Sequence, residues 1–443
     1  MTRAAAADYA EKPNIILFYV DDLGYGDFSC YGGSNMTPRI DRLAENGVRL
    51  TSFYSASSVC SASRGALLTG CYPQRIGVPA AYSSSSKEGL SPDFETLPER
   101  LKKGGYRTAM IGKWHLGHLE RFLPMAQGFD SWFGIPYSND MCSGNKNAST
   151  PNALDLAWCN RDKSWKTWDI PLMRDNQVIE KPVDQRTITQ RYTEEAVQII
   201  EAQDGPAPFF LYIAHTMPHV PLFVSDSYYR SNAQEAMACV LRELDDSVGA
   251  VIDALDKRKL SENTLIIISS DNGPWTQKEH HGGSSGSLRG GKHTIFEGGL
   301  RVPAILYWPR KIGSGQVKQG LASTIDLFPS LAELAGVPVG PDWKGDGIAM
   351  GRFLFGNDPT SPRQEFYYYD HRQTPREIRG LRDSRWKLIL DGQDNSAMLF
   401  DLSCDDGESK NMAADYPELV RGFILRIEAK QRDVGKKKGI GAR

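Results

Sequence analysis

The sequence predicts an α/β fold, in which a mostly parallel central sheet flanked by helices is followed by a smaller C-terminal antiparallel sheet and one helix. Two observations predict it. Between about residues 12 and 340, short apolar runs rich in β-branched residues alternate with longer amphipathic segments, as in parallel strands with covering helices. After residue 340 this alternation gives way to short strand-like segments separated by turn residues. We therefore expect a large domain at 12–340 and a small one at 341–443.

The first strand is expected at residues 14–20, because this run is short, apolar and bounded by polar residues. The next segment carries Thr37 at an N-cap position, Pro38 at the first helical position and Gly47 as a stop, which predicts a helix at 37–47. The same signals predict helices at 96–105, 192–203 and 237–256 and strands at 106–112, 208–215 and 264–270. In the small domain they predict strands at 366–370, 376–382, 385–390 and 397–402 and a helix at 416–434.

The composition excludes several classes of function. The 443 residues are 40% hydrophobic and 24% charged with a formal net charge of -2, so we expect neither a nucleic-acid nor a membrane partner. No apolar run reaches the roughly 18 residues of a membrane span, and the first residues lack the apolar core of a signal peptide. Cys142 and Cys159 bracket a short polar loop and are the pair expected to form a disulfide, which favours a periplasmic or secreted location. The oligomeric state stays open.

Acidic residues follow two of the expected strands directly. Asp21 and Asp22 come after the first strand, and Asp271 and Asn272 come after the strand at 264–270. The carboxyl ends of parallel strands meet at one edge of a sheet, where adjacent acids repel one another unless a cation lies between them. Three carboxylates and an amide oxygen suit Ca²⁺ or Mg²⁺. The alternative is that these are ordinary strand-to-turn residues.

Basic residues are expected at the same edge. Lys113 and His115 follow one strand, and His215 and His219 follow another. A single histidine in such a position is more often a packing residue than a catalyst, but three just beyond strand ends shift the balance toward a site.

A cysteine is expected close to these acidic and basic residues. Cys60 stands where a helix is expected to begin, Arg64 follows four positions later, and Lys292 lies in a glycine-rich loop. A glycine-rich loop lets the backbone approach a ligand closely, although it can also be a plain turn. Together with a divalent cation, these groups form an excess of positive charge suited to a tetrahedral oxyanion.

Six motifs carry a resemblance to a known family. The segments DDLGYGD, CSASRGALLTG, GKWHLG, HTMPH, DNGP and GGKHTIFEGGLRVP occur in the order and approximate spacing of type I, formylglycine-dependent sulfatases. The chain resembles arylsulfatase A-like enzymes most, particularly through GFDSWFGIPYS, and the resemblance covers nearly the whole chain. It implies an alkaline-phosphatase-like fold and a sulfuric ester hydrolase that releases inorganic sulfate from an aryl or carbohydrate sulfate ester.

The resemblance implies a specific modification of Cys60. In this family the cysteine is oxidised to Cα-formylglycine by a maturation enzyme, and the hydrated aldehyde is the nucleophile. A thiol could also attack, but its sulfated form would have no easy route to break down, whereas the second hydroxyl of the hydrate can lose a proton and expel sulfate. Ala62 stands where proline is usual in the motif, which leaves the maturation route open.

The resemblance also implies roles for the strand-end residues. Ca²⁺, or Mg²⁺ in its place, would be bound by the modified Cys60 together with Asp21, Asp22, Asp271 and Asn272. Arg64 and Lys113 would hold the aldehyde hydrate and the sulfate. Lys292 and His219 would face the bridging oxygen, with His219 as proton donor to the leaving alcohol. His115 would assist the release of sulfate, while His215 is expected to be structural.

The substrate side is less defined. Ser138 matches a family position near the sulfate. In a fold of this kind a strand-end loop of the small domain can lean over the site, so His371 and Arg372 are expected to contact the alcohol portion. Three tryptophans of a variable loop could stack on a ring or simply pack: Trp158, Trp165 and Trp168. The expected partner is a sulfated small molecule or glycan.

Two alternatives remain open. The chain could be a phosphonate or phosphate ester hydrolase of the same superfamily. It could also be a non-catalytic binder of sulfated glycans in which Cys60 stays unmodified.

Overall fold

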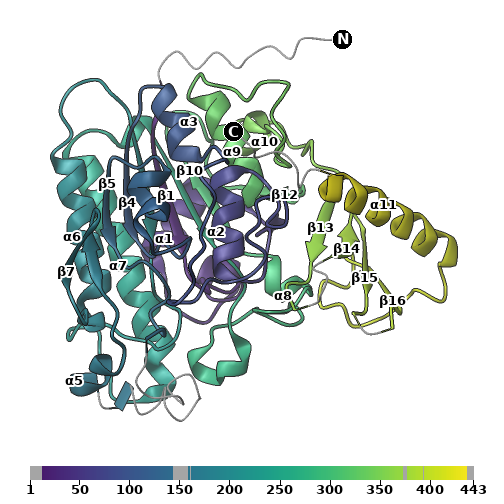
Figure 1. Ribbon diagram of the computed structural model, residues 1–443, viewed down its shortest axis with the longest axis horizontal. Coiled ribbons are helices and arrows are strands. Elements are labelled where there is room, and N and C mark those ends of the chain that lie inside the picture. The colour runs from purple at the N-terminus through teal and green to yellow at the C-terminus, as the bar shows by residue number, and fades with distance from the viewer. Residues whose placement is uncertain (1–11, 143–157, 160, 373–376, 393, 437–443) are drawn as a thin grey trace.

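The computed structural model describes residues 12–142, 158–159, 161–372, 377–392 and 394–436. It consists of a large sheet between two layers of helices, with a small sheet and a long helix packed at one side (Figure 1). This arrangement confirms the predicted fold class.

The large sheet has ten strands in the order β11-β2-β10-β9-β1-β8-β4-β5-β6-β7. Its five central strands, from β9 to β5, are parallel, and the antiparallel partners lie toward the two edges. The bounds are β1 Asn14–Val20, β2 Val48–Leu50, β4 Arg107–Gly112, β5 Ser131–Gly134, β6 Leu172–Arg174, β7 Gln177–Glu180, β8 Phe209–Ala214, β9 Thr264–Ser270, β10 Ala304–Tyr307 and β11 Gln316–Lys318. A separate pair joins β3 (Phe53–Tyr54) and β12 (Ala322–Ser323).

Side chains of β1 alternate between two hydrophobic cores. Ile16 and Phe18 pack into the core under one helical layer, whereas Ile15 and Leu17 pack into the core under the other. The first layer contains α1 (Pro38–Asn46), α6 (Ile188–Glu201) and α7 (Ala236–Lys257), and the second contains α2 (Cys60–Thr69), α3 (Leu97–Lys103), α9 (Leu327–Leu334) and α10 (Gly351–Leu354). The strand is therefore buried on both faces, as a continuous apolar run predicts.

The C-terminal part is an antiparallel sheet covered by one helix. Its strands are β13 (Phe366–Tyr369), β14 (Ile378–Arg382), β15 (Trp386–Leu390) and β16 (Ala397–Asp401), and the helix is α11 (Pro417–Lys436). It contacts the large domain through the short helix α8 (Glu297–Leu300). The wholly buried Glu297 accepts hydrogen bonds from Lys387 and Tyr368, each at 2.9 Å. The boundary at residue 340 stays a prediction.

One sequence prediction is wrong. Cys142 and Cys159 are both free and exposed, and the Cys142 thiol is directed at the Tyr137 hydroxyl, 3.4 Å away. Because these two cysteines do not form the expected disulfide, they give no evidence for an oxidising compartment. Within the described part of the chain, no helix combines the length and apolar character that a membrane span requires.

Candidate active site

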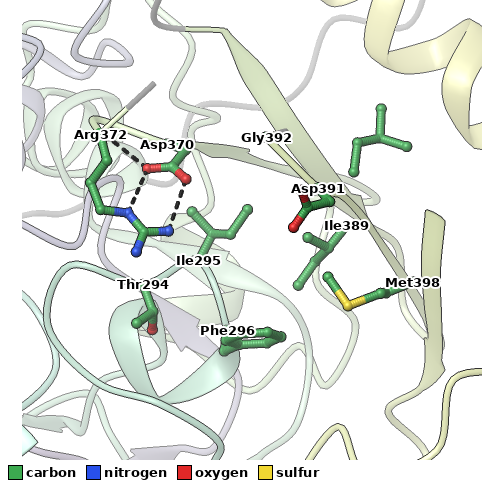
Figure 2. A pocket seen from close by; sticks show the side chains of 10 residues that line it. Thr294, Ile295, Phe296, Asp370, Arg372, Ile389, Asp391, Gly392 and Met398 are labelled. Carbon is green, nitrogen blue, oxygen red and sulfur yellow. Dashed lines mark hydrogen bonds and ion pairs between the residues drawn. The ribbon is translucent and has the colours of Figure 1, made fainter. Parts of the chain in front are cut away.

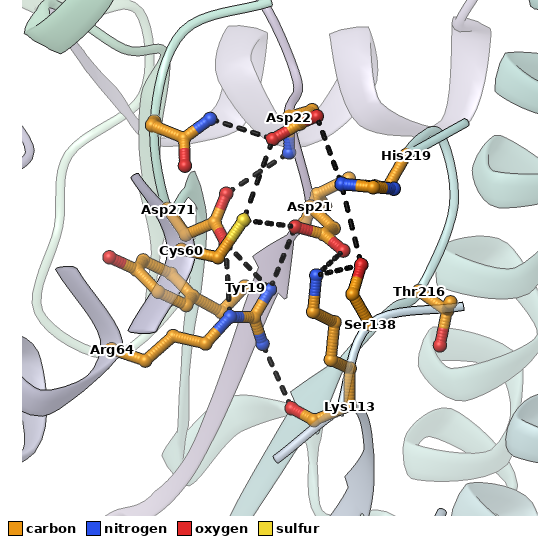
Figure 3. Close-up of polar contacts among 12 residues, drawn as sticks. Tyr19, Asp21, Asp22, Cys60, Arg64, Lys113, Ser138, Thr216, His219 and Asp271 are labelled. Atoms are coloured by element: carbon orange, nitrogen blue, oxygen red, sulfur yellow. Dashed lines mark hydrogen bonds and ion pairs between the residues drawn. The ribbon is translucent and has the colours of Figure 1, made fainter. Parts of the chain in front are cut away.

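The carboxyl ends of four adjacent parallel strands bring the expected residues to one edge of the sheet (Figure 3). Asp271 and Asn272 follow β9, Lys113 follows β4, His219 lies beyond β8, and the two neighbouring aspartates follow β1. These side chains are all at most 4% exposed. Charged groups at this depth require partners, because desolvation penalises an isolated charge.

Two lysines neutralise the aspartates that follow β1. Lys113 Nζ lies 2.5 Å from Asp21 Oδ2, and Lys292 Nζ lies 2.7 Å from Asp22 Oδ2. Although burial opposes ionisation, Lys113 and His219 hold the pKa of Asp21 well below its usual value. Both aspartates are therefore carboxylates in the folded protein.

Arg64 neutralises the third carboxylate. Its Nε and Nη2 both donate to Asp271 Oδ2, at 3.0 and 2.8 Å, and Nη1 donates to the Lys113 carbonyl at 2.9 Å. Burial beside Asp21 raises the pKa of Asp271 to about 7, against the influence of Arg64. The guanidinium is thus fixed between two strand ends with its donors already aligned.

Cys60 lies at the centre of this group. Its Sγ is 3.4 Å from Asp21 Oδ1, 3.8 Å from Asp22 Oδ1 and 3.5 Å from Lys292 Nζ. The residue is the first of α2, whose amide groups favour an anion at that end. Burial raises the pKa of the thiol well above its usual value, against the influence of Lys113 and Lys292, so the thiol is protonated.

The cluster fits a hard divalent cation. Asp21, Asp22, Asp271 and Cys60 each offer one ligand atom, and these atoms lie within 4.8 Å of one another. The Asn272 Oδ1 atom is buried and accepts no hydrogen bond in the described structure, whereas its Nδ2 donates to Asp22 Oδ1 at 2.7 Å. A buried acceptor without a partner costs roughly 1–3 kcal/mol, which coordination would remove. Carboxylate and amide oxygens suit Ca²⁺ or Mg²⁺.

His219 presents its Nε2 atom to the cluster. Nδ1 lies 2.6 Å from the Val220 carbonyl, which can only accept, so Nδ1 carries a proton. Nε2 lies 3.6 Å from Asp22 Oδ2 and 3.4 Å from Ser138 Oγ. Ser138 also accepts a hydrogen bond from Lys113 Nζ at 3.1 Å. By contrast, His215 stacks on Phe18 away from the cluster, as a structural residue would.

His115 also has a nitrogen available at this edge. Its Nε2 donates to the Tyr82 carbonyl at 2.8 Å, which leaves Nδ1 as a buried acceptor with no hydrogen-bond partner in the described structure. The residue adopts a φ of 61°, a conformation that costs energy in a residue other than glycine. Burial, with Lys113 acting in the same direction, holds the pKa of His115 well below its usual value, so its imidazole is neutral.

The two expected substrate residues of the small domain point in different directions. His371 lies 3.2 Å from His293, measured between Nε2 and Nδ1, and so borders the Lys292 loop. The Arg372 guanidinium is paired with Asp370 at 3.0 Å and lines a neighbouring cavity of about 420 Å³ (Figure 2). Arg372 is therefore less available to a group bound at Cys60 than the sequence suggests.

The sequence analysis missed two rings at the mouth of the site. Trp275 lies beside His219, with ring centres 5.9 Å apart, and beside His293, with ring centres 5.4 Å apart. Trp275 follows the DNGP motif and His293 follows Lys292, so their positions beside site motifs were the available signal. Of the three loop tryptophans, Trp158 and Trp168 are core residues, and Trp165 is half-buried against the same core.

Comparison with known proteins identifies the family. The Sulfatase family model matches residues 13–337. The chain belongs to the sulfatase family. A second model, the C-terminal part of N-sulphoglucosamine sulphohydrolase, matches residues 291–432.

Individual relatives agree with this assignment. Arylsulfatase A of Homo sapiens is 39% identical, with 95% of this chain and 88% of that protein covered. N-acetylgalactosamine-6-sulfatase of Canis lupus familiaris is 38% identical, with 82% and 70% covered. The crystal structure of Ps i-CgsB in complex with k-i-k-neocarrahexaose superposes with a TM-score of 0.82 at 29% identity, covering 97% of this chain and 94% of that one. The protein is therefore a sulfatase.

The buried amide oxygen gives a test of metal binding that does not depend on activity. Saturating Ca²⁺ at about 100 times its Kd should stabilise the chelator-treated protein by roughly 2.7 kcal/mol, measured as a rise in thermal midpoint. Asn272→Ala should reduce this rise and Asp271→Ala should abolish it together with turnover, because each removes a ligand. Asp27→Asn is the matched control, since Asp27 is equally buried but accepts from Gly24 and Ser284 backbone amides. Equal rises in all four proteins would contradict the site.

Proposed function

We propose that the protein hydrolyses an aryl or carbohydrate sulfate ester to the alcohol and inorganic sulfate, using a formylglycine formed at Cys60 and a bound Ca²⁺. The observation that supports this best is the placement of Cys60 between carboxylates that can hold a cation and lysines that can hold an oxyanion. Membership of the sulfatase family supports the same reaction.

Cys60 is the proposed site of modification. A separate maturation enzyme would oxidise its side chain to an aldehyde, and the hydrated aldehyde would supply the nucleophilic oxygen. His115 would accept a proton from a hydroxyl at this position, a role supported by its buried, unpartnered Nδ1 and by Tyr82, which contacts both His115 and Ser61. Arg64 and Lys113 would hold the hydrate in one orientation, because both contact Asp21, whose Oδ1 lies 3.4 Å from Cys60 Sγ.

The same groups would bind the sulfate. Lys113, Lys292 and the Ser138 hydroxyl converge on the space in front of Cys60, and each can donate to a sulfate oxygen. Ca²⁺ held by the carboxylates and the Asn272 amide oxygen would act there as a Lewis acid and template. Because these donors are fixed before the substrate arrives, they can stabilise charge that develops during the reaction.

His219 is the proposed proton donor to the leaving alcohol. Its Nδ1 is held by the Val220 carbonyl, so the ring is oriented and Nε2 faces the site. In the imidazolium form Nε2 carries the proton that a poor leaving group requires. Lys292 lies on the same side and would stabilise the bridging oxygen.

The alcohol portion would extend toward the small domain. We propose that His371 contacts it and that Arg372 lines the next cavity, with the small domain beginning near residue 341. The relatives include an arylsulfatase and an N-acetylgalactosamine-6-sulfatase, and one solved relative binds a neocarrahexaose. These relatives support a sulfated small molecule or glycan as the substrate. A periplasmic or secreted location would suit such a substrate.

Release of sulfate tests the proposal directly. Protein expressed with a maturation enzyme should release sulfate from 4-nitrophenyl sulfate or from a panel of sulfated sugars, and should act on 4-nitrophenyl phosphate much more slowly. Faster hydrolysis of the phosphate would favour the phosphate or phosphonate ester hydrolase. Binding of the sulfated sugars without turnover of any ester would favour the non-catalytic binder.

The role of His219 predicts a dependence on the leaving group. His219→Ala should lower kcat for sulfated sugars by about 100-fold or more, because a sugar alkoxide leaves poorly without a proton. The decrease in kcat for 4-nitrophenyl sulfate should stay below about tenfold, because its phenolate needs little protonation. His215→Ala is the control, since His215 packs behind the cluster and should not change the ratio between the substrates. Equal losses in His219→Ala would make His219 a binding residue.

A further inference from the structure

Three partly exposed rings border the buried catalytic group. Trp275, His293 and His371 are each partly exposed, whereas Lys292 and His219 are at most 4% exposed. Lys292 Nζ lies 4.7 Å from the centre of the Trp275 ring. The two groups proposed to face the bridging oxygen, Lys292 and His219, therefore both contact the indole.

The rings form a continuous row. Trp275 meets His293 edge to face at an angle of 79°, and His293 shares a hydrogen bond of 3.2 Å with His371. The row runs from the bridging-oxygen groups to the end of β13, in the small domain. A substituent on that oxygen that extends toward the small domain would cross these three rings.

The rings are held by the segments that carry the catalytic residues. The Lys292 amide donates to the Pro274 carbonyl at 2.8 Å, which ties the Trp275 segment to the Lys292 loop. The His293 amide donates to the Ser58 carbonyl at 3.1 Å, two residues before Cys60. The row is therefore fixed relative to the nucleophile position, as a specificity element must be.

The chemistry of the row suits a sugar. Burial, with Lys292 and His371 acting in the same direction, lowers the pKa of His293 to about 4, so its imidazole is neutral near pH 7. Its Nδ1 is taken by His371, so its Nε2 either donates to or accepts from a hydroxyl group, according to the tautomer. Indole offers an apolar surface that packs on the C–H groups of a ring. Lys278 Nζ lies 4.5 Å from the same indole and adds positive charge beside it.

We propose that Trp275, His293 and His371 form the platform that binds the pyranose ring of a sulfated sugar. This inference rests on the proposed function and narrows its substrate class. The indole contacts the ring, the Nε2 atom of His293 hydrogen-bonds one of its hydroxyls, and His371 orients His293 through the bond between the two imidazoles. A simple aryl sulfate uses the indole but has no hydroxyl for His293.

The platform predicts that its variants lose kcat/KM differently for sugar sulfates and for an aryl sulfate. We would compare hexose and N-acetylhexosamine sulfates with 4-nitrophenyl sulfate as substrates, and use inorganic sulfate as an inhibitor. His293→Gly, which suits the φ of 72° at this position, and His371→Ala should each lower kcat/KM for the sugars about tenfold, mainly through KM. Both should change 4-nitrophenyl sulfate less than about twofold.

Trp275→Ala should lower kcat/KM for both kinds of substrate by about tenfold. Inhibition by inorganic sulfate should be unchanged in all three variants, because sulfate does not reach the platform. Trp386→Ala is the matched control. Like Trp275, Trp386 is partly buried and has a cation over its ring, since Arg385 lies 4.8 Å from the ring centre, but it packs on Tyr416 in the small domain. This variant should leave kcat, KM and the inhibition by sulfate unchanged.

The outcomes separate this inference from the proposed function. Release of sulfate from 4-nitrophenyl sulfate but from no sugar would overturn the platform and leave the hydrolase intact, whereas release from no ester contradicts the hydrolase itself. If Trp275→Ala weakens inhibition by sulfate as much as it raises KM for the sugars, the indole positions Lys292 and the platform is wrong. Equal losses for sugar and aryl esters in both histidine variants would also contradict it.

Discussion

The site depends on a balance of buried charge at the carboxyl edge of the sheet. Three carboxylates are matched by three cations in direct contact: Asp21 with Lys113, Asp22 with Lys292, and Asp271 with Arg64. Each charge alone would be costly at this depth, so the pairs must form together. With all three carboxylates ionised, these six groups carry no net charge. A divalent cation, which favours the ionised form of Asp271, would leave two positive charges. That surplus matches the charge of the sulfate ion that the proposed reaction releases.

The fold supplies this balance from distant parts of the sequence. Parallel strands bring the two acidic turns side by side, since β1 pairs with β9 along its whole length. The first turn of α2 places Cys60 against Asp21 and Asp22, and Arg64, one helical turn later, reaches Asp271. A change in strand order would separate groups that are stable only in contact.

The small sheet is part of the same construction. Its Lys387 is wholly buried between Glu297 and Glu408, at 2.9 and 2.8 Å. Glu297 begins α8, and the carbonyl of Gly299 in that helix accepts from the Gly273 amide, next to Asn272. The small sheet therefore supports the turn that carries Asn272 and the loop that carries Lys292. Because the small sheet is docked at this point, His371, which follows β13, borders the active site.

Local sequence signals predicted the elements that are long and periodic. The strand at 14–20 and the two acidic turns were predictable because an apolar run ending in acids has few structural alternatives. The short strands β2, β6 and β11, at or next to the edges of the large sheet, were missed because three residues are too few to show a period. The disulfide prediction failed because spacing in sequence does not fix the direction of a thiol.

The sequence could not predict which side chains of the two domains would come into contact. Nothing in the DNGP and GGKH motifs shows that Trp275 and His293 meet, and the bond between His293 and His371 depends on how the small sheet docks. Likewise, the pairing of Arg372 with Asp370 could not be foreseen from two adjacent basic residues.

The account is tested most directly at residue 60. Peptide mass spectrometry of active protein should find a fraction in which the Cys60 sulfur is replaced by oxygen and two hydrogens are lost, and specific activity should rise in proportion to that fraction across preparations. Cys60→Ala should fold and still bind sulfate esters without turning them over, because the charged groups remain while the nucleophile is gone. Full turnover by a preparation that contains only unmodified cysteine at this position would contradict the account.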